Sequence, residues 1–98
     1  MDNSPFAPGT TKSVTAGAAS TGVALDPKDA LAPVMRLYNA GSGVAFVRWG
    51  SGAQVAVATD MPLIPGVIEV FSKGSADNFA AIAPTGGGVV YVTPGWGV

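Results

Sequence analysis

The sequence predicts an all-β fold: a small, Gly-rich β-sandwich or jelly-roll-like domain of seven or eight short strands with an extended N-terminal arm. Short runs rich in Val, Ile, Phe and Tyr alternate with turns rich in Gly, Pro, Asn and Asp, at the spacing typical of sandwiches and barrels. Two of these runs, residues 44–49 and 67–71, are apolar on both faces and therefore need cover on both sides. No window of the sequence shows a convincing helical period.

Residues 1–22 are expected to form a flexible arm, and residues 23–98 the sandwich domain. The arm is a low-complexity mixture of Ser, Thr, Ala, Gly and Pro with one aromatic residue, Phe6, so it buries too little apolar surface to order itself. Its stretch from Thr11 to Thr15 alternates enough to add as an edge strand to a neighbouring sheet. The alternative interpretation is a disordered N-terminus.

A short helical turn is predicted after the arm, from Asp26 to Leu31. Asp26 is a suitable N-cap, Pro27 fits the first helical position, and Asp29 stands where the acid of a capping box would stand. Pro33 then ends the turn.

The strands follow this turn. We expect them at residues 34–38, 44–49, 54–58, 67–71, 78–83 and 89–93. The glycine-rich segments between them supply residues that tolerate positive φ, as tight turns require. Neither the G-x-G-x-x-G nor the G-x-x-x-x-G-K-[ST] pattern occurs, so these segments are interpreted as turns and not as phosphate cradles.

The chain carries little charge for its hydropathy. Only 11% of its residues are charged, against about 25% in an average globular protein, and the mean hydropathy is +0.41. Since so few ionic groups cover a free monomer poorly, we expect other protein to cover part of the apolar surface, in a homodimer, a homotrimer or a docked subunit. The net charge of −1 and the scattered Lys and Arg residues argue against nucleic acid as a partner.

The residue inventory also argues against an enzyme. The sequence has no Cys and no His, which removes thiol catalysis, the commonest general base and the commonest metal ligand. We therefore predict no catalytic, cofactor-binding or metal-binding residues and no cofactor. No export signal is recognised, because the chain opens with Asp2 and its first basic residue is Lys12. The uncharged run 78–98 contains Pro84 and Pro94, which argue against a membrane span.

Candidate interface residues come from the arm, from charges inside strands and from tryptophans near glycines. They are Thr10, Thr11 and Val14 in the arm, Arg48 and Glu69 in apolar strands, and Trp49 and Trp96. Arg48 and Glu69 either pair with each other, across strands or across a subunit boundary, or point to solvent. Trp49 either anchors a contact or caps the core, and Trp96 is expected to pack against another subunit.

Three segments carry a resemblance to a known class of proteins: Gly43–Gly50 (GVAFVRWG), Met61–Phe71 (MPLIPGVIEVF) and Val89–Gly95 (VVYVTPG). Together they resemble the small capsid decoration or cement proteins encoded beside the major capsid gene of tailed bacteriophages. The resemblance implies a compact β-sandwich or jelly-roll subunit that assembles as a dimer or trimer on the head surface and clamps neighbouring major capsid proteins. It also implies a virion component synthesised in the bacterial host cytoplasm.

Other functions fit the same architecture. A glycan-binding or host-adhesion module would use Trp49 and Trp96 as stacking platforms for sugars. Another virion position, such as a tail or baseplate subunit, is not distinguished by the sequence. A minimal cupin-like enzyme would share the strand count, but its metal chemistry normally depends on His ligands that this chain lacks.

Overall fold

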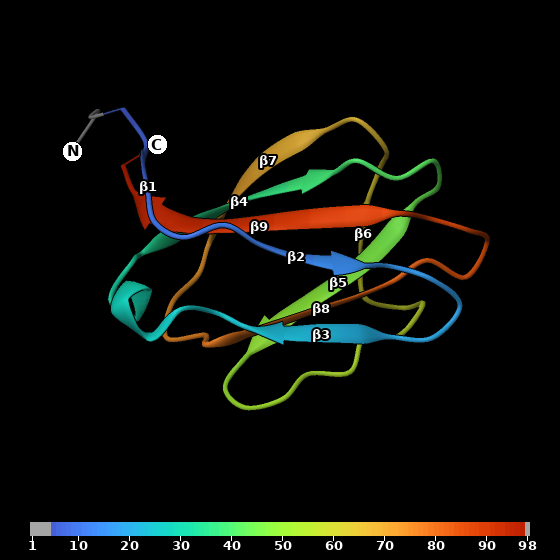
Figure 1. Cartoon of the computed structure of the whole chain (residues 1–98), viewed down its shortest axis with the longest axis horizontal. Helices are drawn as coiled ribbons and strands as arrows, with labels where there is room; N and C mark the ends of the chain where they lie inside the picture. The colour runs from blue at the N-terminus through green and yellow to red at the C-terminus, as the bar shows by residue number, and fades with distance from the viewer. Residues whose placement is uncertain (1–4, 98) are drawn as a thin grey trace.

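The prediction of an all-β fold is confirmed by the computed structural model, which describes residues 5–97. Nine short strands form two antiparallel sheets that pack face to face as a β-sandwich (Figure 1). The five-stranded sheet contains β1 (Ala7–Pro8), β2 (Lys12–Thr15), β9 (Val89–Trp96), β4 (Val34–Asn39) and β7 (Ile68–Ser72). The four-stranded sheet contains β3 (Thr21–Ala24), β8 (Asn78–Ile82), β5 (Ala45–Gly50) and β6 (Met61–Leu63).

The core lies between the two sheets and is made by alternate residues of the central strands. In the five-stranded sheet Met35 and Leu37 of β4 lie beside Val92 of β9 and are fully buried. Phe79 of β8 and Val47 of β5 meet them from the other sheet. Since residues of a strand alternate between its faces, the intervening residues of β4 and β9, such as Tyr38 and Tyr91, point away from this core.

The predicted arm is part of the sandwich over most of its length. β2 pairs with β9 of the same chain, with Val14 opposite Val90, and β3 pairs with β8. The strand expected at 11–15 therefore forms, but on the chain's own sheet and not on a neighbour's. The expected boundary at residue 22 lies within β3, which forms the edge of the four-stranded sheet. Residues 1–4 of the predicted arm lie outside the described residues.

The predicted helical turn is a 3₁₀ helix, η1 (Pro27–Asp29), with Pro27 in its first turn. The Asp26 carboxylate accepts a hydrogen bond from the Lys28 N–H at 3.0 Å, as an N-cap does. Asp29 has a different role from the one expected. It is buried, and its carboxylate accepts a hydrogen bond at 2.9 Å from the N–H of Thr10, which fastens the N-terminal segment to η1.

One predicted strand does not form, and the strands β1, β3 and β6 were not expected. Residues 54–58 form no strand: they lie in the loop between β5 and β6, where the N–H of Ala56 donates to the Ser20 hydroxyl at 2.8 Å. The short strand β6 was not expected because it contains Pro62, which lacks a backbone N–H. The proline is tolerated because β6 is an edge strand.

Asn39 joins the two sheets at one end of the sandwich. Its buried side chain donates hydrogen bonds to the carbonyls of Gly43 at 3.0 Å and Leu63 at 2.7 Å. Its Oδ1 accepts a third hydrogen bond from the N–H of Gly41 at 2.9 Å. Gly41 in turn lies so close to Gly88 that a Cβ on Gly41 would come within 2.6 Å of the Gly88 nitrogen. The glycine-rich segments at this end are thus packed turns, in agreement with their interpretation from the sequence.

In the part of the chain that the structure describes, no helix has the length and apolar character needed to cross a membrane.

Candidate functional site

The outer face of the five-stranded sheet, which points away from the core, is the candidate functional site. Its side chains come from alternate residues of β4, β7 and β9, and the strand register places them in rows. In one row Tyr38 lies between Ile68 and Tyr91. In the next row Arg36 lies between Val70 and Thr93. We call the surface formed by Tyr38, Ile68, Val70, Tyr91 and Arg36 the outer face.

The outer face is apolar and open to solvent. The exposed fractions are 61% for Ile68, 42% for Val70, 37% for Tyr38 and 39% for Tyr91. The rings of Tyr38 and Tyr91 lie nearly parallel, with their centroids 6.1 Å apart. Because these side chains share one face over three adjacent strands, they form a contiguous patch, as is typical of a protein contact surface.

Among the outward-pointing residues of β4, β7 and β9, Arg36 is the one charged residue. Its guanidinium lies over the ring of Phe6, 4.4 Å from the centroid. Its Nε is buried and has no hydrogen-bond partner within the described residues. Phe6 reaches this position because it packs on Gly95, where a Cβ would come within 2.5 Å of the phenylalanine ring.

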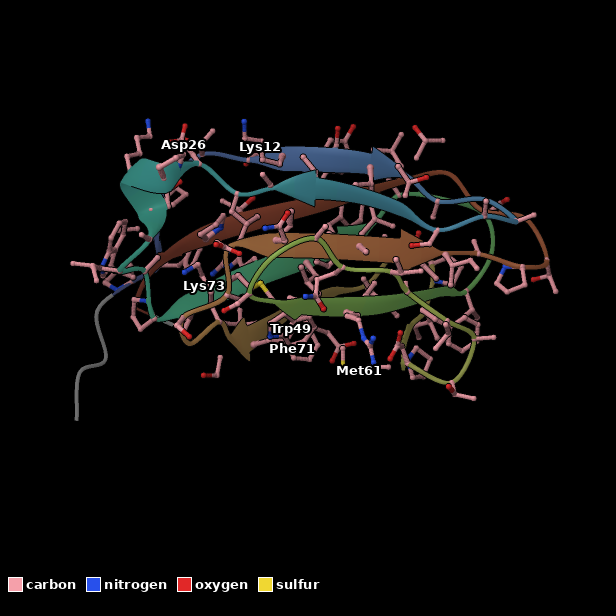
Figure 2. All side chains as sticks on the ribbon, turned by 90° about the horizontal axis from the view of Figure 1, so that it is seen from below. Lys12, Asp26, Trp49, Met61, Phe71 and Lys73 are labelled. Carbon is pink, nitrogen blue, oxygen red and sulfur yellow. The ribbon has the colours of Figure 1, made fainter. Side chains whose placement is uncertain are left out.

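The two predicted tryptophans do not lie on the outer face. Trp49 is at the end of β5, between the sheets, where its ring packs on Phe71 at a centroid distance of 5.3 Å and beside Met61 (Figure 2). This position corresponds to the alternative in which Trp49 caps the core. Trp96 ends β9 opposite Ala7 and is 42% exposed.

Arg48 and Glu69 do not form the ion pair considered from the sequence. Arg48 instead pairs with Asp60, at an N–O distance of 3.4 Å, which is the one salt bridge found among residues 5–97. Arg48 is on β5 of one sheet and Glu69 on β7 of the other, and Glu69 is exposed. Asp60 reaches Arg48 because the loop that it ends returns directly into β6, the neighbour of β5.

The candidate residues of the arm contact other parts of the same chain. Thr10 donates its N–H to Asp29, and the hydroxyl of Thr11 lies 2.8 Å from the hydroxyl of Thr93 on β9. Val14 is buried in the core cluster, where its side chain fills the chain's own sandwich. Its burial follows from the pairing of β2 with β9, which turns Val14 inward beside Val90.

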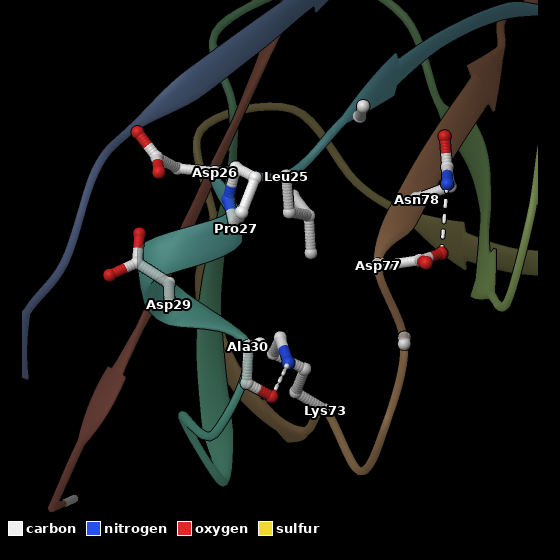
Figure 3. Close-up of a pocket in the computed structure, with 10 residues that line it drawn as sticks. Leu25, Asp26, Pro27, Asp29, Ala30, Lys73, Asp77 and Asn78 are labelled. Carbon is white, nitrogen blue, oxygen red and sulfur yellow. Dashed lines mark hydrogen bonds between the residues drawn. The ribbon is translucent and has the colours of Figure 1, made fainter.

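A pocket of about 300 Å³ lies between η1 and the start of β8 (Figure 3). Leu25 and the buried Lys73 line it, and the Lys73 ammonium donates a hydrogen bond to the carbonyl of Ala30 at 3.1 Å. At the rim, hydrogen bonds from the Asn78 side chain and from the Gly52 N–H lower the pKa of Asp77. In the described residues no group of three or more acidic side chains converges as a metal site would require.

Neither the family models, nor the curated protein sequences, nor the solved structures compared with this chain give a match.

Proposed function

We propose that this chain is a non-enzymatic virion protein that decorates and cements the head of a tailed bacteriophage by docking its outer face on the major capsid protein. The observation that carries this proposal is the exposed apolar patch of Tyr38, Ile68, Val70 and Tyr91. The resemblance described for the sequence supports the choice of partner. The small number of charged residues agrees with a subunit that is covered by other protein in its working state.

The chemistry of the outer face specifies the partner surface. Apolar and tyrosine side chains surround a single guanidinium, so a complementary surface is apolar and carries one carboxylate opposite Arg36. Among residues 5–97 the Arg36 guanidinium forms no salt bridge, so a carboxylate of the partner would be its first anionic partner in this part of the chain. A second copy of this same face would instead bring two guanidinium groups together, which disfavours face-to-face self-association.

A shell gives such a patch a particular advantage. One docking face of this size supports only modest affinity, because part of the contact energy is offset by lost translational and rotational freedom. On a capsid, the same contact is repeated at many equivalent positions, and each bound copy that bridges two capsid proteins opposes their separation. Cementing by this route needs no reacting group in the chain.

Replacing Val70 by lysine should abolish decoration. The change puts a second positive charge beside Arg36, in the middle of the outer face, and a charge that is buried there without a partner opposes docking. We expect the amount of chain that co-sediments with expanded, undecorated heads to fall at least tenfold.

The matched control is Val55→Lys, in a loop valine that is 65% exposed and lies outside the outer face. This variant should co-sediment as the unchanged chain does. Equal binding by the Val70→Lys variant would contradict the proposal. Binding to tails but not to heads would move the protein to another virion position, and quenching of tryptophan fluorescence by sugars would favour a glycan-binding module.

A further inference from the structure

β7 is an open edge of the five-stranded sheet. It pairs with β4 on one side, and no strand of the described chain pairs with its other side. The other edges of the two sheets are less accessible to an added strand. β6 is three residues long and contains Pro62, and β2 and β3 contact each other on the opposite flank (Figure 1).

The hydrogen-bonding groups at this edge can be assigned from the β4–β7 ladder. Asn39 donates its N–H to the carbonyl of Val67, and Lys73 donates its N–H to the carbonyl of Pro33. Because hydrogen-bonded pairs alternate along an antiparallel ladder, the odd-numbered residues of β7 direct their backbone groups towards β4. Ile68, Val70 and Ser72 therefore direct their N–H and C=O groups outward, where an added strand would meet them.

β7 carries few of the features that usually block edge pairing. It contains no Pro and no Lys, it has no bulge in its register with β4, and Glu69 is its one charged residue. Two of its five residues, Ile68 and Val70, are exposed and apolar. An exposed strand edge of this kind binds another extended strand, which pairs with the free backbone groups and packs on the apolar side chains.

We propose that two copies of this chain pair their β7 strands antiparallel across a two-fold axis that passes beside Val70. In this register Val70 faces Val70 of the second copy, and each Ile68 faces Ser72, so every outward backbone group of β7 is paired. The pairing of all three outward residues favours the axis at Val70, and the single charge on the strand disfavours the neighbouring axis at Glu69. An axis at Glu69 would set the two Glu69 residues directly opposite each other, with their Cβ atoms about 5 Å apart, whereas the axis at Val70 places each Glu69 opposite Phe71.

The dimer joins the two five-stranded sheets into one continuous sheet. Val70 and Ile68 of both copies then meet at the seam, with Tyr38 and Tyr91 on either side, so the two outer faces become one surface. This inference does not depend on the proposed capsid partner, since the pairing uses only this chain.

Single cysteines in β7 test the register, because the natural chain has none. Val70→Cys should form a disulfide-linked dimer on mild oxidation, since its two Cα atoms would lie about 5.5 Å apart. Ile68→Cys and Ser72→Cys are the matched controls. Each would lie about 13 Å from its own counterpart, so neither should link alone. A mixture of these two variants should give the heterodimeric link.

Sedimentation equilibrium of the unchanged chain gives an independent readout and should show a dimer mass. A monomer at every concentration, or Val70→Cys dimers that form no faster than Ile68→Cys dimers, would overturn the proposal. Both measurements use the chain without any shell. A dimer that fails to bind heads would therefore contradict the capsid function alone, and a monomer that binds heads would contradict the pairing alone.

Discussion

Replacing Phe79 by alanine is expected to destabilise the fold more than any other single truncation. Phe79 is the largest of the fully buried side chains, and it lies in the middle of the core between the two sheets. Removing a buried phenylalanine ring costs about 3–5 kcal/mol, because the lost apolar contacts leave a cavity that closes only in part. Domains of this size have a free energy of unfolding of only about 5–15 kcal/mol.

Urea denaturation followed by far-ultraviolet circular dichroism measures this effect. The expected result is a large fall in the denaturation midpoint or a chain that is unfolded without urea. Val57→Ala, at an exposed loop valine, is the control and should shift the midpoint little. A loss below about 1 kcal/mol for Phe79→Ala would mean that the sandwich core is not organised around this ring.

Replacing Asn39 by aspartate is the second substitution that we expect to lower the free energy of unfolding strongly. The aspartate keeps the size of the side chain, but its ionised carboxylate cannot donate to the carbonyls of Gly43 and Leu63. It would also be an unpaired charge at a residue that is only 1% exposed. Breaking a buried polar arrangement in this way costs about 3–5 kcal/mol, so the two sheets should separate at this end.

The pH dependence of this variant distinguishes charge from shape. Burial should raise the pKa of the introduced carboxyl group in the folded chain above its unfolded value of about 3.9. The folded variant then binds the proton more tightly than the unfolded one, so its stability relative to the unchanged chain recovers as the pH falls towards that unfolded value. Asn39→Ala removes the hydrogen bonds without adding a charge. The difference in free energy of unfolding between this variant and the unchanged chain should therefore not change with pH.

Much of the sandwich is predictable from the sequence. The strands around residues 34–38, 44–49, 67–71, 78–83 and 89–93 all form, because each is a run of β-branched and aromatic residues between turn residues. The failures have local causes. Residues 54–58 have a strand-like composition, but Gly and Asp residues before and after them favour a loop, and Pro62 is unusual for a strand and is accepted only at an edge.

The candidate site is harder to predict, and β7 shows why. Its apolar residues on both faces predict cover on both sides, but composition does not say which cover comes from the chain itself. The register with β4 decides this by turning Phe71 towards the core and Ile68 and Val70 outward. Tyr38 and Tyr91 were missed for the same reason, since they become neighbours only when β4 pairs with β9.

The most direct test of the proposed docking is an electron cryomicroscopy map of expanded heads decorated with the unchanged chain. We expect the five-stranded sheet to face the shell, with Tyr38 and Tyr91 buried against the major capsid protein and a carboxylate of that protein beside Arg36. A map in which the four-stranded sheet contacts the shell and both tyrosines face solvent would contradict the docking.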